Sequence, residues 1–197
     1  MSPALVHLLP RRSLPVALAM CLAVVLGACS GSSSPAASGS GSAPRIASGG
    51  AGACVAGGDF CGHIKITGGV TRETDFSSYF SEFGTTNCTD WLKGSKDDPT
   101  LLTLPIALVG DINTDAVIQH YKGPGTYDVA DLGGNLGGFQ IAVVHDTFIT
   151  DANTTGTATV AADGSGSVTA TGMQPGGDAN VVQQPIDVTM TWTCSAK

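Results

Sequence analysis

Three histidines stand among residues 54–197, and histidine is the side chain that most often transfers protons near neutral pH. They are His63, His120 and His145, and Asp146 directly follows His145. Neighbouring residues of a strand point to opposite faces of a sheet, so His145 and Asp146 would not orient one another within a strand. The sequence also lacks the G-x-S-x-G motif that positions a hydrolytic serine. We therefore predict no catalytic site, with a Ser/His/Asp site assembled only by the fold as the alternative.

Alternating oxygen-bearing side chains in one segment resemble the start of a calcium loop. Asp111, Asn113 and Asp115 place carboxylate and amide oxygens at every second position. Ala116 stands where an EF-hand needs glycine, and Lys122 stands where it needs a bidentate glutamate. This excludes an EF-hand and leaves a weak surface calcium site or a solvated loop. The glycines of residues 133–138 lack the dinucleotide-binding spacing, so we predict no nucleotide cofactor. Because the EF-hand pattern fails, we assign no residue as a metal ligand.

Aromatic residues gather in one stretch outside the strand-like segments. Tyr79, Phe80, Phe83 and Trp91 lie in it, and the spacing of the first three after Phe76 allows one or two helical turns. On a loop, such rings would supply the contact area of a ligand groove. More often, such residues cover the end of a β-sandwich core. Both roles stay open, and these four residues are the predicted ligand-binding candidates.

The cysteines of residues 54–197 predict two disulfides. They are Cys54, Cys61, Cys88 and Cys194, an even number that allows three pairings. Gly57-Gly58 can turn the chain between Cys54 and Cys61, which favours that pair and leaves Cys88 with Cys194. The C-x-x-C and paired-histidine spacings of zinc sites are absent from the sequence, which argues against a metal site.

Residues 54–197 are strongly acidic. They carry six basic and sixteen acidic side chains, a formal net charge of −10 with neutral histidines. A surface of that sign repels phosphate groups, so we predict no nucleic-acid partner and no binding to anionic headgroups. A cationic ligand, a metal ion and simple solubility are all compatible with this charge.

The same residues have the length of one domain and the pattern of successive strands. Ile186, Val188, Met190, Trp192 and Cys194 alternate with polar residues, which is the period of a half-buried strand. Residues 163–166 (Asp-Gly-Ser-Gly) separate two β-prone runs and predict a hairpin. Strands are expected at residues 62–70, 101–109, 125–130, 139–144, 147–150, 155–161, 167–171 and 186–194. We predict an all-β fold, an antiparallel β-sandwich or partly open barrel stapled by disulfides, with at most short helical turns.

The N-terminal segment has the anatomy of an export signal. Arg11 and Arg12 precede an uncharged, largely apolar run that ends in small residues. That run is shorter than the roughly 20 residues of a membrane-spanning helix. Leu26-Gly27-Ala28-Cys29 resembles a bacterial lipobox. The resemblance implies removal of residues 1–28 as a lipoprotein signal peptide, attachment of diacylglycerol to Cys29, and acylation of the new amino end.

The segment after Cys29 predicts a tether. Residues 30–53 are nearly all Ser, Gly, Ala and Pro, which cannot bury enough surface to offset the entropy of ordering. A Gly/Ser-rich coil of this length has a root-mean-square reach of about 25–30 Å. We therefore divide the chain into a signal peptide (1–28), a lipidated cysteine with a flexible linker (29–53) and a β-sandwich domain (54–197).

Three short segments resemble parts of small exported bacterial proteins that are largely uncharacterised. They are residues 121–127 (Tyr-Lys-Gly-Pro-Gly-Thr-Tyr), 163–166 and 188–194. The last is also similar to the closing strand of small mycobacterial surface lipoproteins. The resemblance implies an exported location and a β-rich architecture, and it transfers no catalytic residue.

These patterns together predict an exported lipoprotein anchored to the outer face of a bacterial membrane. Its expected role is a non-catalytic envelope or cell-surface module that binds an unknown envelope protein or a small ligand. A pocket or an apolar patch would favour that role. A polar cleft joining a histidine to a carboxylate and a nucleophile would favour a secreted hydrolase. A purely structural surface protein would have neither feature.

Overall fold

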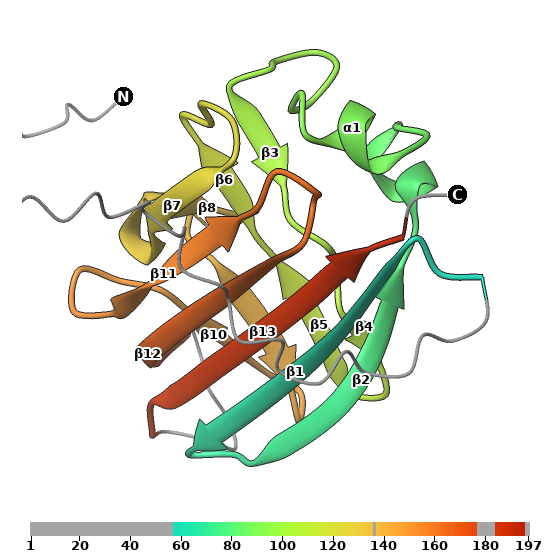
Figure 1. The fold of residues 1–197 in the computed structure, drawn as a ribbon. Coiled ribbons are helices and arrows are strands. Elements are labelled where there is room, and N and C mark those ends of the chain that lie inside the picture. The colour runs from blue at the N-terminus through green and yellow to red at the C-terminus, as the bar shows by residue number, and fades with distance from the viewer. Residues whose placement is uncertain (1–56, 136, 177–183, 196–197) are drawn as a thin grey trace, which may run out of the picture. The chain divides into compact units, whose positions relative to one another are not determined.

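The structure is built from antiparallel strands, and the computed structural model describes residues 57–135, 137–176 and 184–195. The larger sheet contains β1 (Phe60–Gly68), β2 (Arg72–Ser78), β4 (Leu108–Val109), β5 (Ile112–Asp115), β7 (Gly125–Asp128), β9 (Gln140–Val143), β10 (Asp146–Ile149), β11 (Thr155–Val160), β12 (Gly166–Gly176) and β13 (Ile186–Cys194). Its order is β2-β1-β13-β12-β10-β9-β5-β4, with β11 joining β12 to β7 (Figure 1). A second sheet contains β3 (Leu101–Thr103), β6 (Val117–Gln119) and β8 (Leu132–Gly133).

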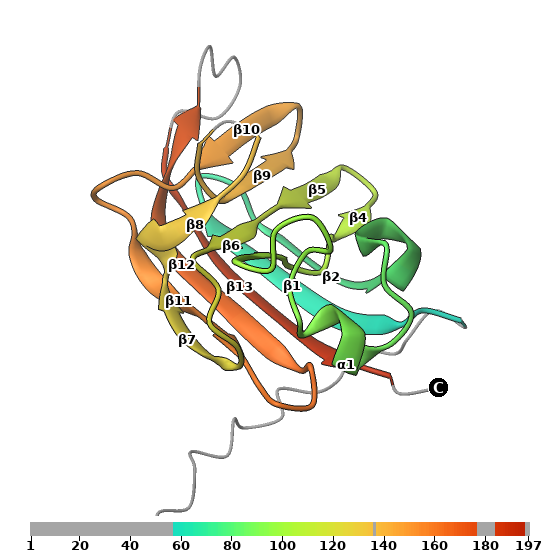
Figure 2. The ribbon, with the colours of Figure 1, turned by 90° about the horizontal axis from the view of Figure 1, so that it is seen from above.

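The larger sheet curls into a nearly closed barrel (Figure 2). The long strand β12 permits the curl because residues 166–171 pair with β11 while residues 174–176 pair with β10. The edge strands β2 and β4 lie side by side. At one end of this seam Arg72 Nη2 donates to Asp111 Oδ2 at 3.1 Å, and at the other Ile106 N donates to Ser78 Oγ at 3.3 Å. The all-β prediction, with its alternative of a partly open barrel, is confirmed.

The helical elements of the described residues are short. They are the 3₁₀ turns η1 (Phe80–Phe83) and η2 (Val129–Asp131) and the α-helix α1 (Cys88–Trp91). Gly84 ends η1 in the left-handed conformation, with φ at 66°, which glycine adopts without steric penalty. No helix in this part of the chain has the length and apolar composition needed to cross a bilayer.

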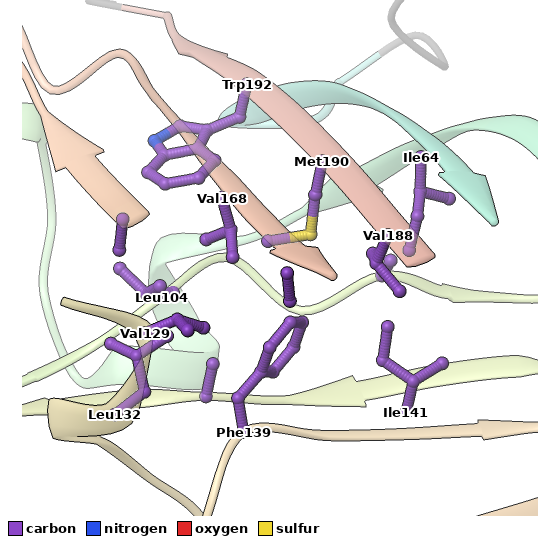
Figure 3. Close-up of a cluster of buried hydrophobic side chains, with 14 of the residues drawn as sticks. Ile64, Leu104, Val129, Leu132, Phe139, Ile141, Val168, Val188, Met190 and Trp192 are labelled. Atoms are coloured by element: carbon purple, nitrogen blue, oxygen red, sulfur yellow. The ribbon is translucent and has the colours of Figure 1, made fainter. Parts of the chain in front are cut away.

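The core lies inside the curled sheet, where alternate residues of opposite walls face each other. Figure 3 shows one wall, contributed by β1, β12 and β13, packing against the residues of the opposite side. The labelled residues of this wall are Ile64, Val168, Val188, Met190 and Trp192. Those of the opposite side are Leu104, Val129, Leu132, Phe139 and Ile141. All ten are buried. Burying one such side chain stabilises the fold by about 1.5–3 kcal/mol, so this packing is the main stabilising interaction.

The outer face of the six neighbouring strands β2, β1, β13, β12, β11 and β7 is polar. One row across it follows the ladder register from His63 to Thr191, Ser167, Thr159 and Thr126. None of these side chains is fully buried. Antiparallel strands with one face on the core and one in water require this alternation, so the period seen in residues 186–194 extends to the neighbouring strands.

Several predicted strand bounds differ from the structure, and β12 runs five residues beyond the predicted end at residue 171. The prediction of one strand over residues 101–109 is wrong, because β3 and β4 are separate and belong to different sheets. Pro105 lies between them and has no N–H to donate to a ladder. The strand expected over residues 125–130 ends at Asp128, whose side chain accepts from Ala130 N at 2.9 Å and begins η2.

Candidate functional site

The aromatic stretch follows directly from the end of β2, and hydrogen bonds fix its path. The Glu82 carboxylate accepts hydrogen bonds from the Ser78 hydroxyl and, at 3.2 Å, from Tyr79 N. Phe80 N donates to Asp59 Oδ2 at 3.0 Å. A glutamate three residues after the capping position is a known signature of a helical start. Glu82 therefore has a structural role in η1 and a defined side-chain position.

The predicted aromatic residues separate into different environments. Phe60 of β1 contacts the rings of Phe80, Phe83 and Trp91 edge to face, with centroid distances of 5.1, 5.7 and 5.0 Å. Phe80 and Trp91 are 5% and 1% exposed, whereas Tyr79 is 40% exposed. Edge-to-face packing of this kind fixes ring orientation as well as burying apolar area. The cluster therefore covers one end of the core, as one of the two predicted roles requires.

The segment after η1 is held over the second sheet by the helix α1. Asn87 caps this helix by accepting from Asp90 N at 2.9 Å. The indole Nε1 of Trp91 donates to Thr103 O of β3 at 3.0 Å, and Ser95 N donates to Leu101 O at 2.6 Å. Both the helix and the loop after it are therefore positioned against β3.

A disulfide between Cys88 and Cys194 attaches α1 to the end of β13. This confirms one of the two predicted pairs. The other predicted pair joins Cys61 to Cys54, and Cys54 lies outside the described residues. Cys29, the predicted lipidation site, also lies outside them. These two assignments stay predictions.

A cavity of about 210 Å³ opens between η1, α1 and β3, and we call it the η1–α1 pocket. Its lining consists of Glu82, Phe83, Thr85, Trp91, Gly94, Ser95, Leu102 and Thr103. The volume far exceeds the roughly 10–15 Å³ that one water needs and is below the roughly 300–1,000 Å³ of drug-sized sites. The pocket therefore has the size for a small ligand.

The polar groups of this pocket are one carboxylate and several hydroxyls. Glu82 is the single charged residue of the lining. The hydroxyl oxygen of Thr85 is buried and has no hydrogen-bond partner in the described part of the chain. A buried polar atom without a partner costs about 1–3 kcal/mol, and a bound molecule or water removes that cost. A ligand or an internal water would each supply the partner that this hydroxyl lacks.

Only part of this pocket was predicted from the sequence. Of the predicted ligand-binding residues, Phe83 and Trp91 line it, Phe80 lies in the core beneath, and Tyr79 is outside the lining. The hydroxyl-bearing residues Thr85, Ser95 and Thr103 were missed. Their signal is weak, because threonine and serine are frequent throughout the chain and only the fold selects these three.

The three histidines lie on different elements. His63 is in β1, His120 follows β6, and His145 forms the turn between β9 and β10. His120 and His145 have φ values of 64° and 68°, the left-handed conformation that non-glycine residues seldom adopt. Asp146 begins β10 and is buried, whereas His145 is exposed. Residues 145 and 146 therefore point into different environments.

His63 is surrounded by carboxylates on the outer face of the sheet. Its Nδ1 lies 2.8 Å from Asp75 Oδ1 and its Nε2 lies 3.2 Å from Glu73 Oε1. The hydrogen bond to Asp75 is the main cause that raises the pKa of His63 above its usual value. Glu73 also binds Lys65 Nζ at 3.1 Å, and that contact chiefly lowers the pKa of Glu73. Because each ring nitrogen faces a carboxylate, His63 is arranged as an ion-pair partner and not as a base beside a nucleophile.

The residues of the possible calcium loop do not converge. Asp111 binds Arg72, which lowers the pKa of the Asp111 carboxyl. Asp115 Oδ2 accepts from Asn135 N at 2.8 Å, and Asn113 is an exposed residue of β5. Across residues 57–135, 137–176 and 184–195, no three His, Cys, Asp or Glu side chains are placed to hold a metal ion.

Comparisons with known proteins give no guide to the function of this chain, so the function is proposed from the geometry of the site. No protein-family model, curated protein or solved structure matches this chain. The resemblance of its segments to exported bacterial lipoproteins therefore stays a prediction from the sequence. The η1–α1 pocket is the site whose shape and chemistry can be tested for binding.

Proposed function

We propose that this protein is an exported lipoprotein that presents a small-ligand-binding domain at the outer face of a bacterial membrane. The observation that carries the binding function is the η1–α1 pocket, with its buried and unpartnered Thr85 hydroxyl. A disulfide and the capped helix α1 support this pocket, so its walls are built before a ligand arrives. A pre-formed site binds with less loss of conformational entropy than one that must order on binding.

The proposed anchor rests on the lipobox-like residues Leu26–Cys29. Acyl chains on Cys29 would hold the chain on the bilayer, because each buried methylene contributes about 0.8 kcal/mol and two or more chains anchor stably. The Ser/Gly/Ala-rich residues 30–53 would then separate the domain from the lipid headgroups. A ligand pocket on such a domain would face the surrounding envelope.

We propose binding and not catalysis because of the side chains that line the pocket. Hydroxyls and one carboxylate are present, and none of the eight lining residues is a histidine, cysteine or lysine. Glu82 already accepts two hydrogen bonds that position η1. A base and a nucleophile within hydrogen-bond reach of one another, as acyl transfer requires, are not combined in this lining.

Two measurements on the full chain test the proposal. Intact mass spectrometry of membrane-extracted protein should give a chain that begins at Cys29 with added acyl mass, and Cys29→Ser should release the protein from membranes. An unmodified mass would reject the anchor. For binding, ¹⁵N-labelled full-length protein in detergent micelles is titrated with a mixture of small amines, sugars and carboxylic acids.

The chain offers an internal reference for that titration. It has two tryptophans, Trp91 in the pocket and Trp192 in the core, and each indole N–H gives a separate NMR signal. Selective movement of the Trp91 signal supports binding in the pocket. If no compound moves it at millimolar concentration, the binding function is rejected, and the purely structural alternative takes its place.

A further inference from the structure

We infer that the ligand of the η1–α1 pocket is a small organic cation carrying an ammonium group. This inference rests on the proposed binding function and assigns the ligand class of the same pocket. It is carried by three properties of the lining: the charge of Glu82, the partly exposed aromatic ring of Phe83, and the uncompensated hydroxyl of Thr85.

The charge of the lining favours a cation. Glu82 is its only charged residue, and no lysine or arginine belongs to it. The Glu82 oxygen Oε2 accepts from the Ser78 hydroxyl and from Tyr79 N, whereas Oε1 accepts no hydrogen bond from the described residues. The side chain is thus held by one oxygen while the other is left for a ligand. An anionic ligand would meet this carboxylate without a compensating positive charge.

The partly exposed aromatic ring of Phe83 also favours a positive charge. The face of an aromatic ring attracts cations within about 6 Å of its centroid. Phe83 is fixed by its edge-to-face contact with Phe60. Trp91 is 1% exposed and forms the floor of the pocket, where its bond to Thr103 O and its contact with Phe60 hold it in place. A fixed ring beside a carboxylate matches an ammonium group bearing alkyl substituents.

The hydroxyls of the lining complete the match. An ammonium N–H, or a hydroxyl elsewhere on the same ligand, can bond the Thr85 oxygen that is otherwise buried without a partner. Ser95 and Thr103 are further hydroxyl-bearing residues of the lining. The strongly acidic character of residues 54–197 raises the local concentration of cations, although it does not select the pocket.

Choline and its uncharged isostere 3,3-dimethylbutan-1-ol test the inference, because they share one shape and differ in charge. Each is titrated into ¹⁵N-labelled full-length protein in 150 mM salt, which screens weak surface attraction. Choline should move the Trp91 indole signal and leave Trp192 in place, with an affinity about tenfold or more above that of the isostere. In Glu82→Gln, the ratio of the affinity for choline to the affinity for the isostere should fall toward one. The glutamine amide oxygen can still accept the hydrogen bond from Tyr79 N.

Two further variants serve as a charge control outside the pocket and as a test of the aromatic ring. Asp131→Asn removes one exposed carboxylate from η2 and should leave choline binding unchanged. Phe83→Leu keeps an apolar side chain but removes a ring, and should weaken choline while leaving the isostere unaffected. The position of the Trp192 signal in each variant shows whether the core has kept its fold.

The outcomes distinguish the inference from the function on which it rests. Equal affinity for choline and its isostere, or binding only of sugars or acids from the mixture, overturns the cationic ligand and retains a binding pocket. Equal loss of choline binding in Asp131→Asn and Glu82→Gln also overturns it, because the attraction would then be general. No response of Trp91 to any compound rejects both.

Discussion

The disulfide between Cys88 and Cys194 connects the first residue of the pocket helix α1 to the last residue of β13, 106 positions further along the chain. Strand β13 pairs with both β1 and β12 in the larger sheet. A helix of four residues is far too short to be stable alone. The bond therefore supplies α1 with an attachment that its own sequence cannot provide.

Removal of this bond should destabilise the protein strongly. In the chain-entropy model, a closed loop of about 100 residues contributes roughly 4–5 kcal/mol, so Cys88→Ser/Cys194→Ser should lose about that much unfolding free energy in urea. The predicted Cys54–Cys61 bond closes a much shorter loop, for which the same model gives roughly 2–3 kcal/mol. A Cys88/Cys194 variant no less stable than the Cys54/Cys61 variant would contradict this account.

The turn beside the disulfide should be destabilised by a side chain at Gly164. Its φ is 84°, and an added Cβ would lie 3.0 Å from the Cβ of Cys194 and 3.2 Å from that of Cys88. Gly172 has a similar φ of 79° with open space around it. Gly172→Ala should cost about 1–2 kcal/mol for the left-handed backbone alone, and Gly164→Ala should cost about 1 kcal/mol more. Urea unfolding of the two variants gives the comparison, and equal losses would show that the contact is loose.

The ion pairs of His63 should make stability depend on pH in a defined direction. The folded-state pKa of His63 is raised, so its stabilisation is fully present below the unfolded pKa of about 6.5 and is lost as the pH rises through the folded pKa. Asp75→Asn removes the main cause and should lower the pKa of the imidazole toward 6.5. A ¹⁵N NMR titration of the ring measures the pKa directly.

Unfolding in urea at about pH 5.5 and about pH 8.5 supplies the matching stability measurement for His63. The wild-type protein should lose more stability than Asp75→Asn between these two pH values. An imidazole that titrates identically in both proteins would show that the 2.8 Å contact between His63 and Asp75 is not maintained in solution.

Two neighbouring tyrosines should respond in opposite directions to loss of the hydroxyl. The Tyr121 hydroxyl is buried with no hydrogen-bond partner in the described residues, and burial raises its pKa to about 12. Tyr127 donates to Gly123 O and accepts from Lys122 N at 3.1 Å. Tyr121→Phe should therefore stabilise the protein by about 1 kcal/mol, whereas Tyr127→Phe should cost about 1–2 kcal/mol. Thermal unfolding of both variants tests this, and destabilisation by Tyr121→Phe would point to a partner that its hydroxyl finds in solution.

Period-two alternation predicted the long strands because their faces have different environments. Residues 186–194 alternate in type, and β13 occupies the same range. Strands β4, β5, β6 and β8 contain two to four residues each, too few to show a period, and they were not predicted as separate strands. Strand β2 was missed because its first residues are all polar or charged and lie at the edge of the sheet.

Residue types and spacing were enough to predict the strand-rich character of residues 54–197, the short helical turn near Phe80 and the pairing of Cys88 with Cys194. Each follows from local spacing or from the parity of a residue count. The folded chain was needed to show that β12 pairs with both β11 and β10 and that β2 lies beside β4. It also showed that Phe83 and Trp91 line a pocket with Thr85 while Phe80 enters the core. These relationships depend on which distant surfaces are buried together, and the free energy of that burial is a property of the whole fold.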